Sequence, residues 1–119
     1  MVSWNNLDTL SSYKELADVK PACLTEVMSG DNGAERVKNY SIPMAAGLSY
    51  NYASKQVDEN VLAALEKLAD EAQLADKFKA LYNGEVVNTG EKRLVLHHMT
   101  RGQLGYAVEA DGVDKRTFY

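Results

Sequence analysis

The chain has 119 residues, a formal net charge of −4 and one cysteine, and its hydrophobic (45%) and charged (25%) contents are ordinary for a soluble globular protein. Neither half is basic enough to neutralise the phosphates of a nucleic acid, and no apolar run approaches the length of a membrane span. A single cysteine excludes an internal disulfide, and the N-terminus lacks the pattern of a secretory signal. We therefore expect a soluble cytoplasmic protein with no nucleic-acid or membrane partner.

Three helical segments are expected in the first third of the chain. Apolar residues at roughly helical spacing predict a first helix from about Ser3 to Asp18. Pro21 suits the first turn of a second helix, which Gly30 can end. Asp31 is a plausible N-cap for a further helical turn through Val37.

The middle of the chain combines two extended runs with one long helical pattern. Residues Tyr40–Met44 and Leu48–Tyr52 are rich in β-forming side chains and are expected to be extended. Asp58 can cap an amphipathic helix. The apolar stripe of that helix comprises Val61, Leu62, Leu65, Leu68, Ala69 and Ala72. A second apolar set is out of phase with this stripe, which implies a bend near Gln73, and Asn83-Gly84 then ends the helix.

The last third of the chain has weaker periodicity. Arg93 to Thr100 fits a strand and a helix about equally well, so both possibilities stay open. Asp111-Gly112 predicts a tight turn between short β-compatible runs. The sequence ends on Lys115–Tyr119 with two aromatic residues and no following element to bury them, so we expect a fragment of a longer protein.

The paired histidines His97 and His98 are the only histidine cluster. Adjacent residues point in different directions on a strand or a helix, and no further Cys or His has the spacing that would complete a metal site. Structural or surface histidines are therefore favoured over metal ligands. A catalytic base at His97 would need a nucleophile, and the region offers none.

Other residues with chemical potential also favour structural interpretations. Cys23 lies beside Leu24 in an apolar stripe, which favours a buried, unreactive thiol. Arg93 and Arg101 could bind a phosphate, but salt bridges to neighbours such as Glu91 are favoured. Glu85 and Glu91 could form an acid–base pair, but neither lies in a visibly apolar pocket. The residues alone indicate no catalytic, substrate-binding or metal site.

One stretch, YNGEVVNTGEKRLVLHHMTR at residues 82–101, resembles a segment near the N-terminus of the phosphoglucose isomerase (glucose-6-phosphate isomerase) family, of the form FNGExxNxTExRAVLHxALR. Upstream, Ser54-Lys55 and the residues from Asp58 are similar to the family's DYSKNxxTEExL. Downstream, Asp111–Asp114 is similar to its DGKD turn. The resemblance covers roughly residues 48–116. Departures from the family pattern, which suggest a divergent branch, are Asn51, Ala53, Gly90, Leu94 and Thr100.

The resemblance implies an N-terminal segment, residues 1–119 as one unit, of an α/β enzyme. The enzyme's three-layer αβα sugar-isomerase domains would lie outside this chain. The segment itself is expected to be mainly α-helical with short β-hairpins, an α+β arrangement. The family interconverts glucose 6-phosphate and fructose 6-phosphate as a homodimer, without metal or organic cofactor.

The resemblance also implies where the chemistry lies. In the family a histidine assists ring opening, a glutamate moves the proton through a cis-enediol, and a Ser/Thr-rich loop holds the phosphate. All these groups belong to motifs outside residues 1–119, so the chain alone is expected to be inactive. A different hypothesis is a stand-alone helical interaction module that docks through the apolar stripes at residues 4–16 and 61–72. No set of residues in the sequence supports a third hypothesis, a small metal-dependent or nucleophilic enzyme.

Overall fold

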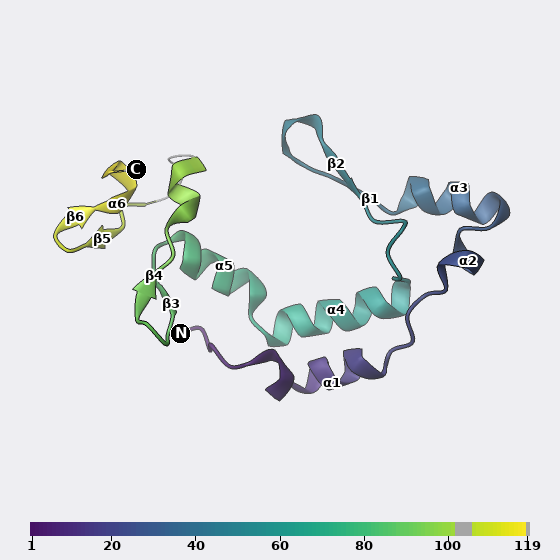
Figure 1. The fold of residues 1–119 in the computed structure, drawn as a ribbon, viewed down its shortest axis with the longest axis horizontal. Coiled ribbons are helices and arrows are strands. Elements are labelled where there is room, and N and C mark those ends of the chain that lie inside the picture. Colours follow the sequence, from purple (N-terminus) through teal and green to yellow (C-terminus); the bar gives the residue numbers. More distant parts are fainter. Residues whose placement is uncertain (102–105, 119) are drawn as a thin grey trace. The chain divides into compact units, whose positions relative to one another are not determined.

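The structure, a computed structural model, describes residues 1–101 and 106–118. The chain divides into two compact units: Ser11–Lys67, and Met1–Leu10 together with Leu68–Tyr119. Both units contain helices and antiparallel two-stranded pairing, with one hairpin in the first unit and two among the described residues of the second (Figure 1). This mixture agrees with the α+β arrangement predicted for the segment. Whether residues 1–119 form one domain of a larger enzyme stays a prediction.

The unit of residues 11–67 contains three helices, one hairpin and the first part of a fourth helix. Its elements are α1 (Ser11–Asp18), α2 (Leu24–Val27), α3 (Gly30–Asn39), β1 (Ser41–Pro43), β2 (Ser49–Asn51) and the start of α4 (Glu59–Glu71). The other unit contains a 3-10 turn (Leu7–Thr9), the end of α4, α5 (Leu74–Tyr82), β3 (Val86–Asn88), β4 (Arg93–Leu94), a 3-10 helix (His97–Arg101), β5 (Glu109–Ala110), β6 (Val113–Asp114) and α6 (Lys115–Phe118). No helix among the described residues is both long and apolar enough to cross a bilayer.

The two predicted extended runs form the β1–β2 hairpin. Ile42 pairs with Tyr50 at the centre of the antiparallel register, and a 3-10 turn at Ala45–Gly47 joins the strands. Ala46 and Gly47 both adopt positive φ, 57° and 72°, so that the chain reverses within three residues. The two predicted extended runs are confirmed, and the structure adds the turn between them.

Helix α4 begins and ends where local signals predict. The Asp58 carboxylate accepts a hydrogen bond from the Val61 amide at 2.9 Å, which satisfies one of the free N–H groups of the first turn. At the other end, Gln73 lies in the left-handed region (φ 55°, ψ 41°) and separates α4 from α5. The Gln73 side chain accepts a hydrogen bond from the Ser3 amide at 2.8 Å. The predicted cap and the bend are therefore both present.

Helix α5 ends in a Schellman motif. The Gly84 amide donates to the Leu81 carbonyl, and the Glu85 amide donates to the Ala80 carbonyl. Gly84 has φ 74°, and a Cβ at this position would overlap the side chain of Val108. The predicted stop at Asn83-Gly84 is confirmed, and the glycine is required both by its conformation and by this close approach.

The N-terminal helices differ from the prediction. Residues 3–6 are not helical, and a 3-10 turn precedes α1, because Leu10 is extended (ψ 144°) and the Thr9 hydroxyl donates to the Asn6 carbonyl at 2.6 Å. Such side-chain bonds to nearby backbone compete with a continuous helix. Gly30 begins α3 where the prediction made it the end of α2. Asp31 lies inside the first turn of α3, and no side chain caps that helix.

Candidate functional site

Three side chains from separate parts of the chain meet at the C-terminal end of α5. The Tyr82 carbonyl accepts hydrogen bonds from Arg116 Nη2 at 2.8 Å and from His98 Nε2 at 3.1 Å. The Arg116 Nε also donates to the Tyr106 carbonyl, and its guanidinium lies 5.2 Å from the centre of the Tyr82 ring. His98 stacks on the same ring, with centroids 4.8 Å apart. Positive or donating groups at a helix C-terminus satisfy its free carbonyls and oppose its dipole.

The hydrogen bond to Tyr82 defines the tautomer of the His98 ring. A carbonyl can only accept, so Nε2 carries the proton and Nδ1 has the lone pair when the ring is neutral. Nδ1 is buried and has no hydrogen-bond partner within residues 1–101 and 106–118. This arrangement holds His98 as a packed aromatic ring on Tyr82.

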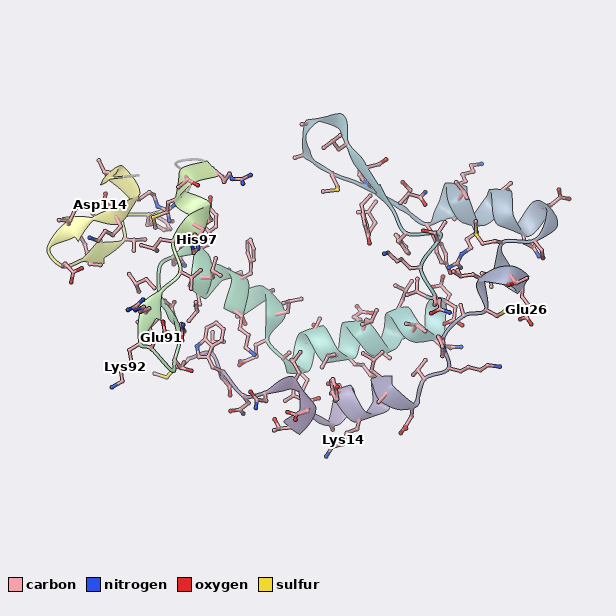
Figure 2. All side chains as sticks on the ribbon, in the orientation of Figure 1. Lys14, Glu26, Glu91, Lys92, His97 and Asp114 are labelled. Atoms are coloured by element: carbon pink, nitrogen blue, oxygen red, sulfur yellow. The ribbon has the colours of Figure 1, made fainter. Side chains whose placement is uncertain are left out.

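The β3–β4 hairpin is held by polar residues of the predicted motif. The Glu91 amide donates to the Asn88 side-chain oxygen at 3.1 Å, and the Asn88 amide group lies 3.5 Å from the Glu91 carboxylate. Arg93 pairs with Glu91 at 3.7 Å, which confirms the predicted salt bridge. All three side chains are exposed, so the ion pair contributes little stability by itself. Figure 2 shows Glu91 and Lys92 on this hairpin and His97 on the helical turn that follows.

Asp114 organises the C-terminal hairpin (Figure 2). Its carboxylate accepts hydrogen bonds from the Thr117 hydroxyl at 2.6 Å and from the amides of Val108 and Arg116 at 3.1 and 3.0 Å. These bonds, that from Thr117 above all, hold the pKa of Asp114 below its ordinary value. The preceding Asp111-Gly112 pair joins β5 to β6 with both residues at positive φ, as the predicted tight turn requires.

The structure does not bring the other singled-out residues together into a reactive centre. His97 is exposed and lines a hollow of about 270 Å³ with Leu94, Leu96 and Thr100. Glu85 and Arg101 are also exposed. Among the described residues, no three His, Cys, Asp or Glu side chains are grouped as a metal ion would need.

The burial expected for Cys23 is wrong. The thiol is exposed, because Cys23 precedes the four-residue helix α2 and does not lie on its apolar face. The neighbouring Ala22 is buried in its place, and its amide donates to the Gln56 carbonyl at 3.1 Å.

Two buried arginines each connect segments that are far apart in the sequence, and neither was predicted to do so. Arg116 joins the C-terminal hairpin to α5, as described above. Arg36 of α3 donates to the carbonyls of Ala53, Lys55 and Val57 at 2.8, 3.0 and 2.7 Å. The partners of both are backbone carbonyls far away in sequence, and these give no signal in a residue pattern.

More than half of the chain matches the sequence model of one known protein family. The sequence model of the family described as phosphoglucose isomerase matches residues 51–117. The chain belongs to the phosphoglucose isomerase family. The match contains the α4–α5 helices, the β3–β4 hairpin and the C-terminal hairpin, together with every member of the Tyr82–His98–Arg116 cluster.

Several proteins named glucose-6-phosphate isomerase are similar to the chain over most or all of its length. The protein of Treponema denticola is 43% identical over 99% of this chain, and that of Borreliella afzelii is 42% identical over all of it. The protein of Treponema pallidum (strain Nichols) is 47% identical over 84% of the chain. These alignments cover only 23%, 22% and 19% of the respective relatives. The chain therefore spans about a fifth of the length of the phosphoglucose isomerases that it matches.

Proposed function

We propose that this chain is the N-terminal part of a glucose-6-phosphate isomerase, which interconverts glucose 6-phosphate and fructose 6-phosphate in glycolysis and gluconeogenesis. The observation that carries the proposal is the alignment with proteins of that name over 99–100% of this chain. The framework supports it, since Gly84, Asn88, Glu91 and Arg93, which the family resemblance singles out, each have a defined structural task.

The proposal extends to the whole enzyme. Its remaining four-fifths would form three-layer αβα sugar-isomerase domains and assemble as a homodimer in the cytoplasm, acting on a sugar phosphate without metal or organic cofactor. Nucleic acid and membrane are not among its proposed partners. The acidic balance of the chain, with 17 Asp and Glu against 13 Lys and Arg, supports this part of the proposal.

We also propose that residues 1–119 contain no catalytic or substrate-binding residue. The buried guanidinium of Arg116 is directed at backbone carbonyls, and Glu91 is part of a turn. His97 is exposed, and the described residues that share its hollow are Leu94, Leu96 and Thr100. The ring-opening histidine, the proton-transferring glutamate and the phosphate loop belong, on this proposal, to the rest of the protein.

The test is to read the coding sequence that surrounds this segment and to assay its full product. The proposal expects several hundred further residues and isomerisation of fructose 6-phosphate, followed through a glucose-6-phosphate dehydrogenase coupling. A full product that lacks isomerase activity while remaining folded by circular dichroism would overturn it.

A second candidate is a stand-alone interaction module derived from the same family. The observation that favours it is the exposure of large apolar side chains, such as Leu48 and Phe78, each with 64% of its surface exposed. Sedimentation of the isolated chain, alone and with a phosphoglucose isomerase, distinguishes the two. A well-packed monomer that binds nothing would count against the module.

A further inference from the structure

The unit of residues 11–67 contains an apolar hollow of about 250 Å³ between the β1–β2 hairpin and the start of α4. Its apolar lining consists of Ile42, Tyr50, Tyr52, Val57, Leu62 and Leu65. Among the described residues, Lys55 is the one charged residue in the lining. The hollow is large enough to receive one bulky side chain.

Hydrogen bonds and ring stacking from Arg36 and Tyr40 hold the walls of the hollow in place. Arg36 bonds three carbonyls of the segment that leads from the hairpin to α4, and its guanidinium lies 4.1 Å from the centre of the Tyr40 ring. Tyr40 stacks on Tyr52 with centroids 4.9 Å apart, and Tyr52 lies 6.1 Å from Tyr50. The Tyr40 hydroxyl in turn donates to Glu59 at 3.2 Å. A pocket whose walls are already ordered loses less entropy when it is filled.

Several side chains that line the hollow are both apolar and exposed. Ile42, Tyr50 and Leu65 have 50%, 48% and 39% of their surface exposed. Residues 41–54 contain no charged side chain, although a quarter of the chain is charged. An exposed, largely apolar hollow of this kind is suited to binding an apolar side chain.

The positive charge of Lys55 limits which side chains are suited to binding in the hollow. Its backbone bonds to Tyr52 and Arg36, but no ion pair to its ammonium group forms within the part of the chain that the structure describes. A cation at an otherwise apolar hollow is complementary to a carboxylate beside an apolar side chain.

We propose that this hollow is the docking site for a segment of the remaining isomerase polypeptide, presenting a bulky apolar side chain next to an Asp or Glu. The inference rests on the proposed function, because relatives of the chain are four to five times its length, with about four-fifths of each unmatched by it. Because the docking segment would belong to the same continuous polypeptide, it would meet the hollow at a high effective concentration. A second copy of this chain is the competing occupant.

The test is site-specific photocross-linking in the full-length protein. The photoreactive residue p-benzoyl-phenylalanine replaces Tyr50, and in a second protein Ile42, so that one disturbed variant does not decide the result. The expected product has the mass of a single chain, and its cross-linked peptide lies beyond Tyr119 and contains Asp or Glu. The same probe at Lys14, an exposed position on α1, is expected to give no defined product (Figure 2).

The charge requirement is tested in the same proteins. Lys55→Glu is expected to lower the yield of the cross-link several-fold, and Lys38→Glu, at an exposed lysine of α3, to leave it unchanged. A covalent dimer, a cross-link confined to residues 1–119, no cross-link, or equal effects of the two substitutions would overturn the proposal. Isomerase activity is measured on the same samples. Full activity without the cross-link refutes the docking site alone, and a folded, inactive protein with the cross-link refutes the proposed function alone.

Discussion

The Cα of Gly84 and the side chain of Val108 lie so close together that no Cβ can be placed between them. Val108 itself is almost fully buried, at 4% exposure. Its amide donates to Asp114, and its carbonyl accepts a hydrogen bond from the Lys115 amide. The contact therefore joins the end of α5 to the C-terminal hairpin through a residue that has to be glycine.

Replacing this glycine should be costly. Gly84→Ala combines a left-handed backbone penalty of about 1–2 kcal/mol with an overpacking penalty of about 1–3 kcal/mol. Gly112→Ala is the matched control, because Gly112 has the same φ of 74° but open space around its Cα. Urea unfolding should show a clearly larger loss for Gly84→Ala, partly recovered when Val108→Ala is added. Equal losses at the two glycines would show that the contact with Val108 is unimportant.

Arg36 is expected to stabilise the unit of residues 11–67. Arg36→Met keeps much of the side-chain volume but leaves the carbonyls of Ala53, Lys55 and Val57 without their donor. The expected loss of unfolding free energy is about 2–4 kcal/mol, since each unsatisfied partly buried carbonyl costs about 1–3 kcal/mol and water recovers some of it. Lys38→Met, at an exposed position of the same helix, should change stability little. A small effect at Arg36 would mean that solvent replaces its bonds.

The Asp114 carboxylate should make stability depend on acidity. Its folded pKa lies below the ordinary value of 3.8, because Thr117 and two amides donate to the ionised form. The stabilisation is therefore complete above that value and disappears as the pH falls below it through the folded pKa. Unfolding free energies between pH 2 and 5 should fall less steeply with acid in Asp114→Asn. Identical slopes for the two proteins would contradict this assignment.

Cys23 should react as an accessible thiol. Because its side chain is exposed at the start of α2, Ellman's reagent should modify it in the folded chain about as readily as in urea. Slow modification of the thiol in the folded chain would contradict its exposure and would agree with the burial predicted from the sequence.

Local signals predicted much of this fold because their partners are close in sequence. The Asp58 cap, the bend at Gln73, the glycine stop after α5 and the Asp111-Gly112 turn each depend on residues within a few positions. The predicted N-terminal helix was too long, because Thr9 and Asn6 form a competing local bond that periodicity does not register.

Long-range partners were not predictable in this way. Arg36 and Arg116 bond carbonyls 10 to 34 residues away, and a carbonyl carries no residue identity. The same limit applies to the tyrosine stack, since Tyr40 and Tyr52 meet only after the hairpin has formed. The motif at residues 82–101 thus identified the family, while the contacts that its residues make became visible only in three dimensions.

We propose that residues 1–119 form part of the structural framework of a glucose-6-phosphate isomerase and contain none of its catalytic groups. The most direct measurement is the coupled isomerase assay on the purified 119-residue chain beside the full-length protein. We predict turnover of fructose 6-phosphate by the full-length protein and none above background by the chain alone. Turnover by the isolated chain, abolished by His97→Ala or another substitution within it, would contradict the claim.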